Sequence, residues 1–83
     1  MRIDKFLKVS RLIKRRTVAK EMADQERVLV NGRQVKSSYN VAINDIIEIQ
    51  FGVKALKVKV LNIKETTKKA EASDLYEVVE WHF

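Results

Sequence analysis

The residues best suited to chemistry in this sequence are arginines and lysines gathered in its first twenty positions. Residues 1–20 hold eight basic side chains and one acidic one, whereas the remainder holds 9 basic and 10 acidic residues. The formal net charge of +6 therefore originates in one N-terminal segment. Such a charge density displaces the counterions of a phosphate backbone, so the segment predicts a surface for a polyanion. Its basic residues are Arg2, Lys5, Lys8, Arg11, Lys14, Arg15, Arg16 and Lys20.

The arginines carry the most weight in this prediction, because a planar guanidinium can contact two phosphate oxygens or stack on a base. The lysines supply supporting point charges. Asp4, the single acid of the segment, either caps the first helix or orients a neighbouring arginine such as Arg2 or Arg16, and the sequence leaves both alternatives open. A different interpretation of the whole segment is a solvated helix face that only keeps the protein soluble.

Two helices are expected to position these side chains. Helical spacing places one set of residues on a buried face, namely Ile3, Phe6, Leu7 and Ser10, and another set on the opposite side, namely Asp4, Lys5, Lys8 and Arg11. A break is expected around residues 14–16. Thr17 then caps a second short helix whose buried stripe consists of Val18, Ala19, Met22 and Ala23.

A small, mostly antiparallel sheet is expected after the helices, which makes the fold class α+β. Asn31-Gly32 favours a type I′ turn in a hairpin that starts at residues 28–30 and returns at residues 34–36. Further strands are expected at residues 46–51 and 55–63, with a turn at residues 53–54. The stretch 68–75 favours helix, and the last residues either continue that helix or form a strand. At 83 residues, we expect one domain.

Several function classes find little support in the composition. The chain has no cysteine and one histidine, so we expect no disulfide, metal or cofactor. We find no Ser-His-Asp set and no glycine-rich phosphate loop, so we expect that the protein is not an enzyme. No run approaches the roughly 18 apolar residues of a membrane span and none suggests export, so we expect a cytoplasmic protein without membrane contact.

The order of these motifs resembles the S4 RNA-binding domain over roughly residues 1–50. The matching stretches are Arg2-Ile3-Asp4-Lys5-Phe6-Leu7, Ser10-Arg11, Arg15-Arg16-Thr17, Ala19 and Val28-Leu29-Val30-Asn31-Gly32. The whole chain, including Thr66-Thr67-Lys68-Lys69, is similar to the stand-alone RqcP (YabO-type) family, which is related to the heat-shock protein fifteen family.

The resemblance implies an αL RNA-binding motif and a role in ribosome-associated quality control. It implies binding to large ribosomal subunits that carry a stalled peptidyl-tRNA, with contacts to rRNA and tRNA. It also implies support for C-terminal tailing of the nascent chain by a partner elongation factor. Two positions depart from the domain pattern, because Glu26 and Asn44 stand where glycine is usual. We expect a reshaped turn at Glu26, because glutamate does not readily adopt a positive φ.

Weaker expectations concern residues outside the first helices. Arg33 and Lys36 on the hairpin, and Lys68 with its neighbour Lys69, could extend the RNA surface. Tyr39 is the better candidate for base stacking, because Phe6, Leu7 and Phe51 are expected in the core.

Other functions remain as alternatives to the ribosomal one. They are a detached RNA-targeting subunit of an RNA-modifying enzyme, a DNA-binding helix-turn-helix protein, and a module that binds an acidic protein. Against DNA, the positive charges cluster in the first helix and the turn instead of the second helix. A monomer is the default expectation.

Overall fold

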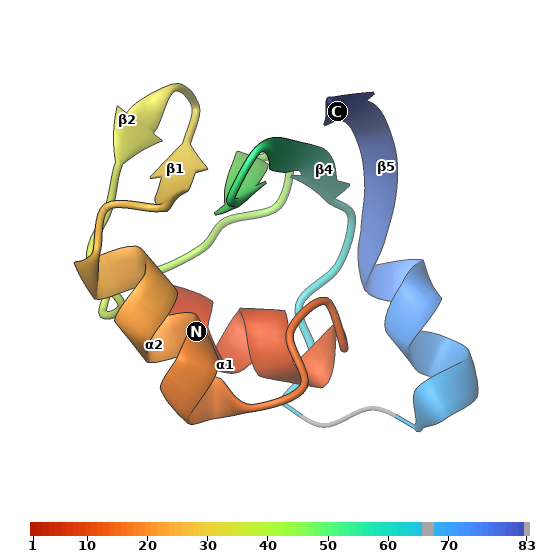
Figure 1. Cartoon of the computed structure of the whole chain (residues 1–83). Helices are drawn as coiled ribbons and strands as arrows, with labels where there is room; N and C mark the ends of the chain where they lie inside the picture. Colours follow the sequence, from red (N-terminus) through yellow and green to blue (C-terminus); the bar gives the residue numbers. More distant parts are fainter. Residues whose placement is uncertain (66–67, 83) are drawn as a thin grey trace.

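The computed structural model describes residues 1–65 and 68–82. Two α-helices come first and strands follow, with a 3-10 helix before the last strand (Figure 1). The α+β prediction is therefore confirmed. In chain order the elements are α1 (Ile3–Val9), α2 (Arg16–Asp24), β1 (Val28–Val30), β2 (Arg33–Gln34), β3 (Ile46–Phe51), β4 (Lys54–Val60), the 3-10 helix η1 (Lys69–Leu75) and β5 (Tyr76–His82).

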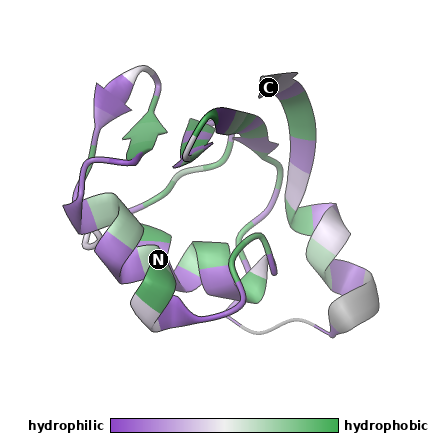
Figure 2. Cartoon of the chain, viewed as in Figure 1, coloured by the Kyte–Doolittle hydropathy of each residue, from purple (hydrophilic) through white to green (hydrophobic). Residues whose placement is uncertain are grey.

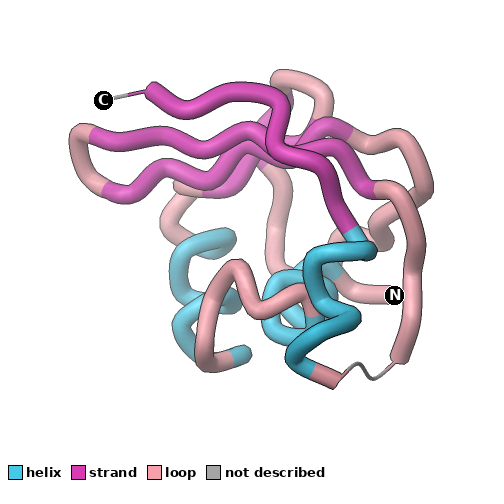
Figure 3. Tube along the Cα trace, turned by 90° about the vertical axis from the view of Figure 1, so that its right-hand side faces the viewer, coloured by secondary structure: helices cyan, strands magenta, loops and turns pink. Residues whose placement is uncertain are grey.

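The described strands form one five-stranded sheet in the order β2-β1-β3-β4-β5. Every pair of neighbouring strands is antiparallel. The helices lie on one side of this sheet, as Figure 3 shows from the side. The molecule therefore has two layers, with the basic N-terminal segment in the helical layer. Within the described part of the chain, no helix is long and apolar enough to cross a membrane.

The core lies between the helices and the sheet. Alternate residues of β3 and β4 point inward, so that Ile47 pairs with Val58 and Ile49 with Leu56. From α1, Phe6 and Leu7 are fully buried, as the helical spacing predicted. Burial of each such side chain contributes about 1.5–3 kcal/mol. Figure 2 shows hydrophobic and hydrophilic residues alternating along the elements, as expected for strands with one covered face.

Some predicted core positions are wrong in detail. Phe51 is 37% exposed because it is the last residue of β3, next to the turn that leads into β4. Val18 on α2 is also exposed, whereas Ala19 and Ala23 on the same helix are buried. Asp4 is not on the exposed side of α1 but is 2% exposed. Helical periodicity separates faces only coarsely on helices as short as these.

The β1–β2 hairpin confirms the turn predicted at Asn31-Gly32. Both residues have positive φ, 52° at Asn31 and 83° at Gly32, which is the requirement of a type I′ turn. The next turn lies one residue earlier than predicted, because β4 already begins at Lys54 and leaves Gly52-Val53 to connect the strands. β4 also ends at Val60, before the predicted end at residue 63.

Helix α2 ends in a Schellman motif, in which the backbone N–H of Arg27 donates to the carbonyl of Met22 at 2.9 Å and that of Glu26 to Ala23 at 3.0 Å. Glu26 is left-handed, with φ of 65°. The expected reshaping of this turn is therefore wrong. Glutamate adopts the conformation that glycine usually supplies, because the two hydrogen bonds satisfy carbonyls that would otherwise lack partners. Asn44 likewise has φ of 77°.

The C-terminal stretch resolves the alternative left open by the sequence. Residues 69–75 form η1, and the chain then forms an edge strand, β5, beside β4. The acidic residues of this stretch, Glu77 and Glu80, thus lie on a strand. The prediction of a cap at Thr17 is also wrong, because Arg15 is the N-cap residue of α2 and makes no side-chain cap hydrogen bond.

Candidate nucleic-acid interface

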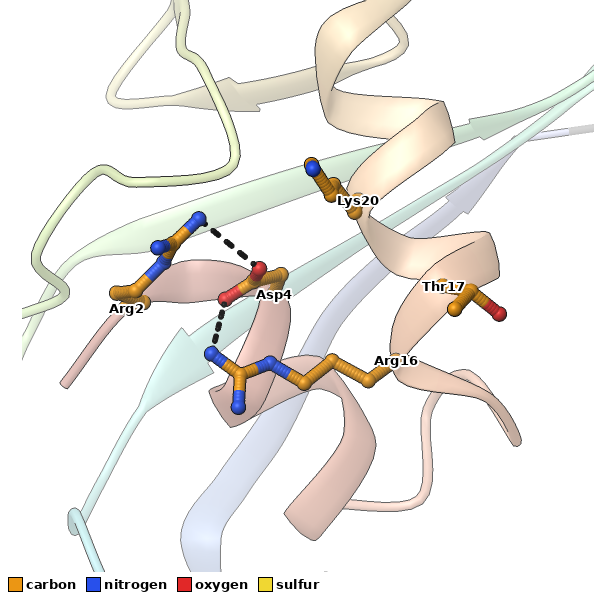
Figure 4. A pocket seen from close by; sticks show the side chains of 5 residues that line it. All are labelled: Arg2, Asp4, Arg16, Thr17 and Lys20. Atoms are coloured by element: carbon orange, nitrogen blue, oxygen red, sulfur yellow. Dashed lines mark hydrogen bonds and ion pairs between the residues drawn. The ribbon is translucent and has the colours of Figure 1, made fainter.

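The fold brings the two ends of the basic segment together around one carboxylate. Arg2, Asp4, Arg16, Thr17 and Lys20 line a surface hollow of about 290 Å³, here called the arginine site (Figure 4). Arg2 and Asp4 come from the start of α1, and the other three residues come from the first two turns of α2. Contacts between the two helices therefore create the arginine site.

Asp4 is the buried centre of the arginine site. One of its oxygens, Oδ2, lies 3.3 Å from Nη2 of Arg2. The other, Oδ1, accepts hydrogen bonds from Nη2 of Arg16 at 3.4 Å and from the backbone N–H of Lys5 at 2.7 Å. A carboxylate with a side chain only 3% exposed is costly unless it is paired in this way.

These contacts bear on both roles considered for Asp4. The N-cap residue of α1 is Arg2, and its side chain makes no capping hydrogen bond. Asp4 lies inside the first turn and holds two arginines. Asp4 therefore orients both arginines and also satisfies one free backbone N–H of the first turn, that of Lys5, although it does not occupy the N-cap position.

Both guanidiniums keep hydrogen-bonding capacity for a ligand. The side chains of Arg2 and Arg16 are 46% and 47% exposed. Figure 4 shows that each guanidinium turns one nitrogen toward Asp4 and leaves another facing away. Since a guanidinium has five N–H donors, most of them remain available beside the ammonium of Lys20. The arrangement suits an anionic group with several acceptor oxygens, such as a phosphodiester.

The N-terminus of α2 is unusually positive. Arg15 precedes the helix and Arg16 begins it, and the first turn contains no acidic residue. Because the helix dipole already places partial positive charge at this end, cations here are unfavourable for stability. Exposed residues that lower stability in this way are typical of ligand-binding sites. It favours a bound anion at this end of α2.

The other predicted contacts surround the arginine site without lining it. Arg11 adopts a left-handed conformation just after α1, with φ of 61°, and is exposed. Three more exposed residues lie on α1 or between the two helices, namely Lys8, Lys14 and Arg15. Lys5 is half-buried and forms an ion pair with Glu65, which lowers the pKa of Glu65 through their hydrogen bond and the lysine charge.

The weaker candidates lie farther along the chain. Arg33 is on β2, Lys36 follows it, and Lys68 precedes η1; all three are exposed. The side chain of Lys69 lies outside the described part of the structure.

Two features of the surface were missed by sequence reasoning. Thr17 lines the arginine site instead of capping α2. Tyr39 donates a hydrogen bond from its hydroxyl to Oδ2 of Asp45 at 3.2 Å. Burial, together with the charge of Asp45 and this hydrogen bond, raises the pKa of Tyr39. No spacing rule links positions 39 and 45, although both fall in a polar loop, so only the folded loop reveals the pair.

Comparison with known proteins identifies the family. The model of the S4 domain matches residues 1–47. The chain belongs to the S4 domain family. Residues 1–47 extend from the start of the chain through α1, α2, β1 and β2 to the beginning of β3, so the arginine site lies wholly within the S4 domain.

Full-length relatives place the chain in a narrower family. It is 58% identical to the RQC P-site tRNA stabilizing factor of Streptococcus pneumoniae, over 95% of this chain and 90% of the relative. It is 54% identical to the protein of the same name in Bacillus subtilis, over 95% and 92%. The chain therefore belongs to the family of proteins with that name. The S4-domain prediction and the predicted relationship to RqcP proteins are confirmed.

A solved structure extends the likeness beyond the S4 domain. The trimeric structure of Heat Shock Protein 15 from Vibrio cholerae superposes with a TM-score of 0.88 at 29% sequence identity, covering 95% of this chain and 81% of that one. The similarity therefore includes β4, η1 and β5 as well as the helices.

Proposed function

We propose that this S4-domain protein binds RNA by holding a backbone phosphate at the arginine site. The observation that carries the proposal is the pair of half-exposed guanidiniums fixed by one buried carboxylate, with Lys20 beside them. Fixing the arginines in advance lowers the entropy lost on binding. The other cations of residues 1–20 then add affinity by releasing counterions, without reading sequence. The protein acts by positioning RNA and not by catalysis.

The RNA that we propose is that of large ribosomal subunits carrying a stalled peptidyl-tRNA. Relatives 54–58% identical are named RQC P-site tRNA stabilizing factors, which supports a binding surface for tRNA. We further propose that the protein supports C-terminal tailing of the nascent chain by a partner elongation factor. It would act in the cytoplasm, as a monomer and as one domain over residues 1–83.

Sedimentation of tagged protein from cell lysate tests this function. We expect the wild type to migrate with large subunits and peptidyl-tRNA in a sucrose gradient. A double Arg2→Ala, Arg16→Ala variant is expected to remain in the light fractions, because both guanidiniums proposed to hold the phosphate are removed. The matched control is a double Lys54→Ala, Lys59→Ala variant, which removes the same charge from β4 and is expected to migrate like the wild type.

Each departure from this pattern has a definite meaning. Wild type confined to the light fractions would contradict the ribosomal function. Equal loss in both double variants would show that net charge, and not the arginine site, drives association. Addition of competing tRNA separates RNA binding from binding to an acidic protein. We expect tRNA to displace the protein from ribosomal RNA but not from an acidic protein. Sedimentation of the purified protein tests the monomer against the trimer seen for the Vibrio relative.

A further inference from the structure

A second hollow lies beside the β1–β2 hairpin, and its lining residues are all different from those of the arginine site. It measures about 400 Å³ and is lined by Val30, Asn31, Arg33, Val35 and Tyr39; we call it the Tyr39 hollow. This volume falls within the range of about 300–1,000 Å³ that is typical for sites of small organic groups. The S4-domain match contains all of these residues, yet the phosphate contacts proposed above leave them without a role.

The wall of the Tyr39 hollow is held rigid by Asp45, which is 9% exposed. The hydroxyl of Tyr39 donates to Oδ2 of Asp45 at 3.2 Å, and the amide of Asn31 donates to Oδ1 at 3.2 Å. The other end of the Asn31 amide accepts the backbone N–H of Ile46 at 3.0 Å. These bonds fix the direction of the tyrosine ring before any ligand arrives, which reduces the entropy cost of binding.

The chemistry of the lining fits a planar aromatic group next to a negative charge. The ring of Tyr39 is half-buried and the apolar side chain of Val35 lines the same hollow, so together they offer a stacking face and an apolar wall. Arg33 is exposed and brings a guanidinium to the same hollow. An unpaired nucleotide combines a flat base with a phosphate, which matches these two features.

Backbone contacts connect the Tyr39 hollow with the arginine site. The backbone N–H of Ile3 donates to the carbonyl of Tyr39 at 2.7 Å, and Arg2 forms a β-bridge with Asn40. Tyr39 is therefore tied directly to the first residues of α1.

We propose that the Tyr39 hollow binds one unpaired nucleobase of the RNA, stacked on Tyr39, while Arg33 contacts the adjacent phosphate. This inference rests on the proposed RNA-binding function. The guanidinium of Arg33 and the basic segment nearby favour RNA over an aromatic side chain of a protein partner. The hollow thus recognises exposed single-stranded character, whereas the arginine site recognises the backbone alone.

Two short RNA hairpins test the proposal by fluorescence anisotropy. One has a fully paired stem, and the other carries a single bulged adenosine in the same stem. We expect the wild type to bind the bulged RNA more tightly. Tyr39→Ala is expected to lose on the order of 10-fold in affinity for the bulged RNA alone, because stacking on one aromatic side chain is removed. Tyr39→Phe keeps the ring and should retain most of the preference.

Matched variants separate stacking from other effects. Tyr76→Ala changes the other tyrosine of the chain, at the start of β5, and is expected to keep the preference. Arg16→Ala is expected to weaken the binding of both RNAs equally. Arg33→Gln is expected to lower the affinity for the bulged RNA several-fold. If circular dichroism shows that Tyr39→Ala does not fold, the result for Arg33→Gln tests the nucleobase site in its place.

The outcomes distinguish this inference from the function on which it rests. Wild type that binds neither RNA would contradict RNA binding at the arginine site and the inference together. Binding of both RNAs with equal affinity, or a preference that survives in Tyr39→Ala and Arg33→Gln, would overturn the nucleobase site alone. The latter result is also expected if the hollow takes a side chain of a protein partner.

Discussion

Asp4 is the residue around which the chemistry of this protein is arranged. Its carboxylate is almost fully buried, yet its partners Arg2 and Arg16 reach the surface. A surface ion pair between mobile side chains contributes little to stability, but a buried carboxylate fixes the geometry of the arginines that it contacts. We therefore regard Asp4 as a positioning residue for the two side chains that we propose bind phosphate.

Asp4→Asn tests this role, because it keeps the shape of the side chain and removes its charge. The variant loses one negative charge, so its net charge rises by one, which by itself would strengthen RNA binding. We expect weaker binding instead, because the guanidiniums lose their common anchor. The free energy of unfolding should fall by about 1–2 kcal/mol, since water can still reach both arginines.

The measurements for Asp4→Asn are RNA titration and urea unfolding, beside Asp74→Asn as a control with the same charge change. Asp74 is exposed on η1. The control should bind RNA at least as tightly as the wild type. Binding by Asp4→Asn that is equal to or tighter than that of the control would show that charge, and not position, governs the site.

Helix α2 combines a strained end with a positively charged beginning. Arg15 and Arg16 oppose the helix dipole at its N-terminus, and Glu26 adopts a left-handed conformation just beyond its C-terminus. Both features disfavour an isolated helix of nine residues. Tertiary contacts compensate, because Ala19 and Ala23 are fully buried in the core.

Glu26→Gly is predicted to stabilise the protein. The left-handed region costs a residue with a Cβ about 1–2 kcal/mol, and glycine avoids this cost. Part of the resulting stabilisation is offset, because glycine loses more conformational entropy on folding. The expected increase in unfolding free energy is about 0.5–1 kcal/mol in urea titration. Glu26→Gln controls for the charge and should leave stability nearly unchanged.

Gln25→Gly is the conformational control for Glu26→Gly. Gln25, at φ of −90°, lies in a region that residues with a Cβ adopt freely, so glycine should destabilise there. Equal effects at positions 25 and 26 would contradict the left-handed assignment.

At the scale of the whole molecule, a long-range ion pair connects the helical layer with the second half of the chain. Lys5 on α1 forms an ion pair with Glu65, sixty residues away on the segment that follows β4. Through this pair the basic layer is connected to the part of the chain outside the S4-domain match. The hydrogen bond from Lys5, followed by its charge, lowers the pKa of Glu65 below its ordinary value.

Acid titration tests this long-range contact. A lowered pKa in the folded state means that Glu65 contributes stability above its unfolded pKa, and that this contribution is lost as the pH falls through the folded value. Carbon NMR titration of the Glu65 carboxyl is expected to show its pKa rising toward the ordinary value in Lys5→Gln. Lys8→Gln, on the exposed side of the same helix, should leave it lowered. An unchanged pKa in Lys5→Gln would rule out the pair in solution.

Local sequence features determined the secondary structure and the location of the charge. Alternating β-branched residues specified β3, and Asn31-Gly32 specified the hairpin turn, because both depend on neighbouring residues only. The excess of positive charge in residues 1–20 is a property of composition. The S4-domain resemblance was also readable, since its matching stretches follow one another in a fixed order within residues 2–32.

Only the tertiary structure decided how these parts form a site. Burial of Asp4, its selection of Arg2 and Arg16 among eight basic residues, and the link between Tyr39 and Asp45 depend on the packing of segments that periodicity treats separately. The C-terminal residues form a strand because β4 offers a free edge, which decides between the helix and the strand that local propensity left open. Glu26 keeps a positive φ because two hydrogen bonds at the end of α2 outweigh its intrinsic preference.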